Sequence, residues 1–304
     1  MMVNNNSNKN YYCAGLSVDV EDGISIVMHD HFNIIMDPTD RVISNTNKIL
    51  RIFKKNKVRG TFFILGEVAE NYPDLLKQID TDGHEIGVHG YNHEQIFKYT
   101  PERLKETLSR TKHLIEDVIG KQVFGFRAPA FSIDQHTSWA LSVIAECEFF
   151  YDSSIFPSKS IRYGWEGFPK DICKLNFNHS LKLIEVPLSV TQIFGKSIPV
   201  GGGGYLRYFP LWWTKKAIAN IIKERPAVVY LHPYELDKEK YPEYFYEALS
   251  SAPLKKRMQL RFYRYKKDTV EFKLNKITKD FHFAPMIEII QMIENQSGIR
   301  EISL

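Results

Sequence analysis

The amino-acid sequence predicts an α/β fold in which parallel strands alternate with helices, in a barrel or a wound sheet. Three observations lead to this class. Strand-like and helix-like runs alternate from residue 14 to residue 231, and reactive side chains stand at the C-terminal ends of the strand-like runs. The 304 residues are 43% hydrophobic, which is sufficient for one large α/β domain.

The individual elements follow from local patterns. Short runs rich in β-branched and aromatic residues predict strands at 14–20, 60–66, 85–88, 124–126 and 227–231. Helical periodicity predicts helices at 43–56, 74–80, 101–119 and 137–146. We find no fixed-period repeat and no linker. The expected organisation is therefore a polar tail (1–12), a catalytic domain (13–250), and a C-terminal extension (251–304) that carries a basic segment and a final helix packed on the barrel.

Composition excludes several classes of protein. The net charge of +4, from 40 basic and 36 acidic residues, does not indicate a nucleic-acid partner. The polar, Asn-rich start lacks the pattern of a secretion signal, and no run is apolar enough for a membrane helix. We therefore expect a cytoplasmic protein, either in solution or at the inner face of the membrane. The three cysteines lack a Cys-x-x-Cys pair, so a metal would be held by His and carboxylates.

Carboxylates and histidines gather after two of the predicted strands. Asp19 and Glu21 share one face of the first strand, and Asp22 begins the following loop. His89 and His93 lie in GVHGYNHE, where glycine and asparagine disfavour a helix and indicate a bent loop that aims both rings at one point. Two His and one carboxylate leave metal positions open for water and substrate, although such residues also serve as helix caps or core hydrogen-bonding groups.

Several strings resemble motifs of the polysaccharide deacetylase family with the NodB-homology domain. They occur in the family's order between about residues 14 and 235. The matching strings are Ser17-Val18-Asp19, Thr61-Phe62-Phe63, Asp82 to His93, Arg127-Ala128-Pro129-Ala130-Phe131, Tyr151-Asp152-Ser153-Ser154 and Leu231-His232-Pro233. The first motif departs from the adjacent aspartates of many members and resembles a subgroup with Asp-Val-Glu that is linked to exopolysaccharide or surface-glycan synthesis.

The resemblance implies a distorted (β/α)7-type barrel that hydrolyses the N-acetyl group of a sugar with the help of a divalent metal. Zinc is the expected ion, with cobalt or nickel as alternatives. His89 and His93 would be ligands, together with Glu21 or, as the substitute, Asp22. The expected substrate is a glycan or a lipid-linked or nucleotide-linked precursor.

The resemblance also implies catalytic roles. Asp19 would take a proton from the attacking water, and His232 would protonate the departing amine. Arg127 would orient Asp19, and Asp152 would pair with His232. Arg127 and Asp152 could instead be a structural ion-pair residue and a turn residue.

Two further segments concern the substrate and its surroundings. The four glycines at 201–204 either line a sugar cleft or form a flexible surface loop, and we expect Phe131, Gly203, Gly204 and Tyr205 to bind substrate. The segment 255–267, KKRMQLRFYRYKK, contains seven basic residues and no acid. It is either a solvated face or a surface that attracts an anionic membrane or a lipid-linked glycan.

Two other functions are compatible with the same fold. One is a catalytically silent carbohydrate-binding protein, and the other is a metal-free amidohydrolase of the allantoinase-like kind. The presence of two histidines and an acid argues against both. Bound metal together with acetate release would distinguish the deacetylase from these alternatives.

Overall fold

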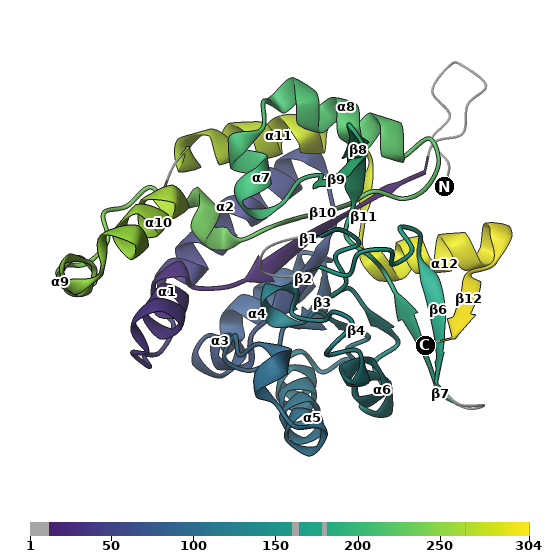
Figure 1. Ribbon diagram of the computed structural model, residues 1–304, viewed down its shortest axis with the longest axis horizontal. Coiled ribbons are helices and arrows are strands. Elements are labelled where there is room, and N and C mark those ends of the chain that lie inside the picture. Colours follow the sequence, from purple (N-terminus) through teal and green to yellow (C-terminus); the bar gives the residue numbers. More distant parts are fainter. Residues whose placement is uncertain (1–11, 160–163, 178–180, 265, 304) are drawn as a thin grey trace.

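A mostly parallel sheet forms the centre of the molecule in the computed structural model, which describes residues 12–159, 164–177, 181–264 and 266–303 (Figure 1). The strands lie in the order β10-β1-β2-β3-β4-β5-β7-β6-β12, and β11 pairs with β1. All pairs in this sheet are parallel except β6 with β7. The bounds are β1 (Ala14–Val20), β2 (Thr61–Ile64), β3 (Glu85–Val88), β4 (Gly125–Phe126), β5 (Tyr151–Asp152), β6 (Cys173–Phe177), β7 (Leu181–Glu185), β10 (Val228–Leu231), β11 (Phe283–Ala284) and β12 (Arg300–Ser303).

Helices connect the strands and surround the sheet (Figure 1). The α-helices are α1 (Gly23–Phe32), α2 (Arg41–Asn56), α3 (Gly66–Asn71), α4 (Pro73–Thr81), α5 (Pro101–Ile119), α6 (Trp139–Glu146), α7 (Gly203–Tyr208), α8 (Leu211–Ile221), α9 (Glu243–Ser251), α10 (Leu254–Arg264), α11 (Val270–Asp280) and α12 (Met286–Ser297). The short 3-10 helices are η1 (Ile96–Lys98), η2 (Pro129–Phe131), η3 (Pro233–Leu236) and η4 (Lys267–Thr269). This α/β arrangement is the fold class that the sequence predicts.

Strand β1 lies at the centre of the core. All seven of its residues are buried. Successive side chains of a strand point to opposite faces, so Leu16, Val18 and Val20 enter the main apolar cluster whereas Ser17 and Asp19 reach the polar interior. The strand thereby carries a reactive carboxylate on a rigid, fully buried support.

The gap between β7 and β10 is bridged by a short connection. A separate antiparallel hairpin, β8 (Val190–Ile193) with β9 (Lys196–Pro199), follows β7. Just before it, Ser189 N–H donates to the Val228 carbonyl over 3.3 Å, and Val228 N–H donates to Ser189 Oγ over 2.7 Å. These two bonds bring the chain after β7 against β10, which gives the sheet its distorted barrel form.

The predicted elements agree with the structure where their local pattern is strong. The strands 14–20 and 85–88 and the helix 101–119 have the bounds of β1, β3 and α5. Helix α1 was not predicted, because its sequence GISIVMHDHF starts with glycine and contains several β-branched residues. None of the helices in the described ranges has the length and apolarity required to span a lipid bilayer.

The C-terminal segment packs against the barrel and returns to the sheet. Met286 and Ile289 of α12 lie against Gly15 of β1, and β12 pairs with β6. Helices α9 and α10 project from the barrel beside α1 (Figure 1). The division at residue 250 stays a prediction, and all but the last residue of the predicted tail lies outside the described residues.

Candidate active site

Four strands deliver polar side chains to one end of the barrel. Glu21 follows β1, His89 follows β3, Arg127 follows β4 and His232 follows β10. The carboxyl ends of parallel strands meet at one edge, which is where reactive groups collect in such folds. These four residues are all buried.

Glu21, His89 and His93 form a candidate metal centre. Glu21 Oε1 lies 2.9 Å from His89 Nε2 and 3.3 Å from His93 Nε2. His89 Nδ1 donates to the Arg127 carbonyl over 2.8 Å, because a carbonyl can only accept. With its hydrogen on Nδ1, the His89 ring can present an unprotonated Nε2 toward the Glu21 carboxylate, an arrangement that a cation between them would stabilise.

A bent loop brings the two histidines together, as the sequence predicts. Gly90 has a φ of +77°, which glycine adopts without strain, and an added Cβ would lie 3.2 Å from Pro129 Cγ. His93 has a φ of +59°. Two left-handed residues within four positions turn the chain sharply after β3 and direct both rings to Glu21.

Asp22, which was predicted as the substitute metal ligand, caps helix α1 in the structure. Its Oδ2 accepts hydrogen bonds from Ser25 N–H and Thr39 N–H, each over 3.0 Å, and its Oδ1 accepts from Thr39 Oγ over 3.0 Å. Asp22 is thus the N-cap of α1. Because its oxygens are engaged in this cap, the geometry favours Glu21 as the carboxylate ligand.

Arg127 holds Asp19 in place. Its Nη1 donates to Asp19 Oδ1 and to Ser17 Oγ, each over 2.7 Å, while its Nε and Nη2 donate to the carbonyl and Oγ of Ser153. The guanidinium lies 4.3 Å from the centroid of the Phe63 ring. This fully buried arginine orients Asp19 and compensates its charge.

His232 lies between the two carboxylates and is held by a third. Its Nε2 is 3.9 Å from both Asp19 Oδ2 and Glu21 Oε2. Its Nδ1 is 2.7 Å from Glu235 Oε1. The predicted pairing of Asp152 with His232 is wrong, because Glu235 takes that place and Asp152 accepts hydrogen bonds from the hydroxyl and backbone N–H of Ser154.

The charges of the cluster shift the pKa values of its members. Burial raises the pKa of Glu21, but the nearby His232 and His93 outweigh it and hold that pKa well below its usual range. Burial lowers the pKa of His93, yet Glu21 and Asp30 raise it to about 10. The Glu21 carboxylate and the neighbouring imidazoles thus stabilise each other's charged forms.

The predicted substrate-binding residues lie at different distances from this centre. A Cβ on Gly203 would lie 3.8 Å from His232 Cε1, so this glycine borders the site. Phe131 is buried edge-on against Tyr230. Tyr205 stacks on Phe209, and Gly204 lies next to Tyr208. The glycine run forms a turn and the start of α7, and only its Gly203 contact reaches the reactive groups described above.

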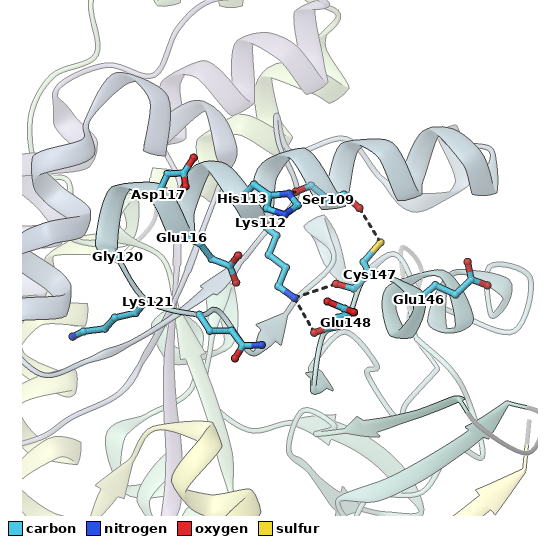
Figure 2. Close-up of a pocket in the computed structure, with 11 residues that line it drawn as sticks. Ser109, Lys112, His113, Glu116, Asp117, Gly120, Lys121, Glu146, Cys147 and Glu148 are labelled. Carbon is cyan, nitrogen blue, oxygen red and sulfur yellow. Dashed lines mark hydrogen bonds between the residues drawn. The ribbon is translucent and has the colours of Figure 1, made fainter.

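Two surface hollows differ in their relation to the site. One of about 470 Å³ is lined by residues that include Asp30, whose Oδ2 is 3.4 Å from His93 Nδ1. Sequence patterns did not single out Asp30, since α1 itself was not predicted. A larger hollow of about 740 Å³ lies between α5 and the end of α6, where Lys112 donates to the Cys147 and Glu148 carbonyls (Figure 2). None of the site residues lines this larger hollow.

His84 and Glu235 show what the sequence did and did not reveal. The prediction that His84 is structural is supported by its ring packing against Phe53 and Phe62, where burial lowers its pKa to about 4. Glu235 was missed. Its spacing three residues after His232 is that of a capping box, and this spacing was the available signal.

Two family models match successive parts of the chain. Residues 36–147 match the polysaccharide deacetylase family, and residues 153–291 match a domain of unknown function, DUF3473. His89, His93 and Arg127 lie in the first region, whereas His232 and Glu235 lie in the second. Residues 36–147 are therefore similar to the polysaccharide deacetylase family, as the motifs indicate.

The individual proteins that are similar in sequence to this chain include deacetylases. The uncharacterized protein YlxY of Bacillus subtilis is 42% identical over 85 residues, which are 28% of this chain and 27% of the relative. The peptidoglycan deacetylase of Helicobacter pylori is 32% identical over 108 residues, 36% of each chain. The chain therefore spans well under half the length of these curated relatives. Deacetylases of this kind are amide hydrolases.

A solved structure shares the fold. A Mycobacterium smegmatis protein provisionally assigned as a polysaccharide deacetylase superposes with a TM-score of 0.64 and 18% identity, over 99% of this chain and 96% of the other. The superposition covers both regions. The mixed α/β fold is thus that of the NodB-type deacetylase barrel.

Proposed function

We propose that this protein is a metal-dependent N-deacetylase that hydrolyses the acetamide of an N-acetylated sugar and releases acetate. The observation that carries the proposal is the position of Glu21 Oε1 within 3.3 Å of both His89 Nε2 and His93 Nε2, beside Asp19 and His232. A divalent cation bound by Glu21, His89 and His93 would polarise the acetamide carbonyl and lower the pKa of water toward about 7. Zinc suits this donor set, with cobalt or nickel as alternatives.

The side chains around the centre fit the proton transfers of amide hydrolysis. Asp19 Oδ1 is engaged by Arg127, so Oδ2 is the oxygen that would accept the proton of the attacking water. His232 Nε2 lies 3.9 Å from that oxygen and would donate a proton to the departing amine. Amide cleavage needs this proton, because an amide anion is a very poor leaving group.

The acids around His232 keep it ready for this role. Burial lowers the pKa of His232, but Glu21 and Glu235 raise it above the usual value of 6.5. The protonated form required of a general acid is thereby favoured. A base that is ionised beside an acid that is protonated is the arrangement that amide hydrolysis requires.

The substrate is an N-acetylated carbohydrate in this proposal. It is a glycan or a lipid-linked or nucleotide-linked precursor, and the relatives named as peptidoglycan deacetylases support the sugar class. The link to exopolysaccharide synthesis and a location at the inner face of the membrane stay predictions. Nothing in the site favours nucleic acid.

A basic and apolar tip on α10 supports the predicted contact with membranes. Leu254 and Met258 are 69% and 53% exposed one helical turn apart, and the charged Lys255 and Arg257 between them are exposed too. Lys256 donates to the His31 carbonyl, which places α10 against the end of α1. Exposed apolar and cationic side chains together fit an anionic bilayer. Co-sedimentation with anionic but not with neutral vesicles, lost on converting Lys255 and Arg257 to glutamine, tests this contact; equal sedimentation of the variant would refute it.

The function is tested by metal content and acetate release. Elemental analysis of the purified protein should give about one metal per chain, and acetate should be released from one or more N-acetylhexosamine glycans or nucleotide sugars in a chelator-sensitive reaction. His89→Ala should lose both metal and activity. The control His113→Ala, which lies at the remote hollow of Figure 2, should keep both.

The two alternatives predict different results in the same experiment. A silent carbohydrate-binding protein would bind glycan without releasing acetate. A metal-free amidohydrolase would turn over an amide substrate in the presence of chelator. Either result would overturn the proposal.

A further inference from the structure

Glu235 occupies an unusual position beside His232. Its Oε1 lies 2.7 Å from His232 Nδ1 and also accepts the backbone N–H of His232 over 3.2 Å. The same oxygen thus contacts both the ring and the main chain of one residue. Glu235 is fully buried, so this contact is shielded from water.

The other oxygen of Glu235 faces a second buried charge. Arg207 Nε lies 3.8 Å from Glu235 Oε2, and Arg207 is itself buried. Arg207 belongs to α7, the helix that starts in the glycine run. Lys273 of α11 donates to the carbonyls of Leu206 and Arg207, which ties the end of this short helix to the barrel.

Aromatic rings complete the environment of His232. The ring of Tyr234 stacks on the imidazole with the centroids 4.8 Å apart and the planes 17° from parallel. Tyr230 lies edge-on at 5.6 Å. With one face stacked on Tyr234 and Nδ1 held by Glu235, Nε2 is directed to the carboxylates Asp19 and Glu21.

We propose that Glu235, supported by Arg207, is the positioning residue that fixes the orientation and tautomer of the general acid His232. Because Glu235 Oε1 is an acceptor in its ionised form, Nδ1 must carry the hydrogen, and Nε2 is the nitrogen that faces the substrate. This inference rests on the proposed function, in which His232 donates a proton to the amine. It also gives a role to the region that matches DUF3473, since Arg207, His232 and Glu235 all lie within residues 153–291.

The region of unknown function is therefore part of the active site. The matched range includes β6, β7 and β10, which belong to the same sheet as the strands of the first region. The first region supplies the candidate ligands His89 and His93. The second region supplies the proposed general acid His232 and its positioning residue Glu235. Neither part alone contains both a metal centre and a positioned proton donor.

The test compares Glu235→Ala and Glu235→Gln with wild type and with Asp237→Asn. Asp237 is a suitable control because it is a buried acid two residues away that pairs with Arg41 instead of His232. Metal content, kcat and KM for acetate release, and the ¹⁵N chemical shifts of the His232 ring are measured on the full chain. The ring shifts report which nitrogen carries the hydrogen, independently of turnover.

We expect kcat of Glu235→Ala to fall about 10- to 100-fold, the usual effect of losing a residue that orients a functional histidine. The KM, metal content and Asp237→Asn control should stay at wild-type values. Glu235→Gln should lose less, because its amide oxygen still accepts from Nδ1. Recorded at a pH at which the His232 ring is neutral, the ring shifts should show hydrogen on Nδ1 in wild type and Glu235→Gln, and a mixture of tautomers in Glu235→Ala.

Several results would overturn the inference. One is a Glu235→Ala kcat equal to that of Asp237→Asn, and another is an unchanged tautomer in Glu235→Ala. If Glu235→Ala does not fold, Glu235→Asp replaces it, because the shorter side chain withdraws the carboxylate from Nδ1. If wild type releases no acetate, the proposed function fails, while the ring shifts still decide whether Glu235 sets the tautomer.

Discussion

The two adjacent acids after β1 give the sharpest test of the metal centre. Glu21→Gln should lose metal while the fold is kept, and Asp22→Ala should lose stability while metal is kept. The contrast follows from the direction of the two side chains. Glu21 Oε1 faces two histidine nitrogens, whereas Asp22 caps α1 and binds Thr39.

The expected magnitudes follow from the contacts of each residue. Zinc bound by four ligands is worth about 10–16 kcal/mol, so one ligand contributes roughly 2.5–4 kcal/mol, or about two to three decades in Kd. Asp22→Ala removes an N-cap of about 1 kcal/mol and two hydrogen bonds to Thr39 of about 1 kcal/mol each. The free energy of unfolding should therefore fall by about 2–4 kcal/mol.

The assay has two independent readouts on the same proteins. Titration with zinc against a competing chromogenic chelator gives the metal Kd, and urea unfolding of the metal-free protein gives the free energy of unfolding. The reasoning would be refuted if Asp22→Ala weakened zinc binding by two decades while Glu21→Gln bound zinc as wild type does. That result would make Asp22 the ligand.

Three further changes have defined outcomes. Asp19→Asn should keep metal and fold, since Arg127 retains its bonds to Ser17 and Ser153, but kcat should fall by about two to four decades; near-normal turnover would remove Asp19 from the role of base. His232→Ala should lose acetate release and keep stoichiometric metal by elemental analysis, so loss of metal would assign His232 to the ligand set instead. Burial and the neighbouring Asp152 raise the pKa of Glu185 well above 4.5, so the folded state binds its proton more tightly than the unfolded state and stability falls as pH rises above about 4.5. Glu185→Gln cannot ionise and should remove that decline, and urea unfolding at pH 5 and pH 8 would contradict this if the difference from wild type were the same at both.

The sequence was most informative where a local pattern and a chemical requirement coincide. The bounds of β1, β3 and α5 could be predicted, because each has strong periodicity or a clear cap, such as Thr100 followed by Pro101 at the start of α5. His89 and His93 could be predicted as a pair because Gly90 and Asn92 rule out a helix between them.

Other features depend on tertiary contacts that one sequence does not display. The partner of His232 was predicted to be Asp152, which lies in a neighbouring motif, but the side chain that reaches Nδ1 is Glu235 in the turn directly after it. Asp22 could not be separated from Glu21 without knowing that the chain bends into α1 at that point. Its cap signal, Asp22 followed by Ser25, is short and was outweighed by the β-branched residues of the helix.

The position of β1 between β2 and β10 has a consequence for how the chain acquires its structure. Its register partners Thr61–Ile64 are close in sequence, but its other neighbour, Val228–Leu231, is synthesised more than 200 residues after it. Until β10 arrives, one edge of this fully buried strand is unpaired, and pairing over such a separation is slow because the loop entropy must be lost first. We expect the growing chain to pass through a compact intermediate with an open edge at β1, and that edge is where association between incomplete chains would begin.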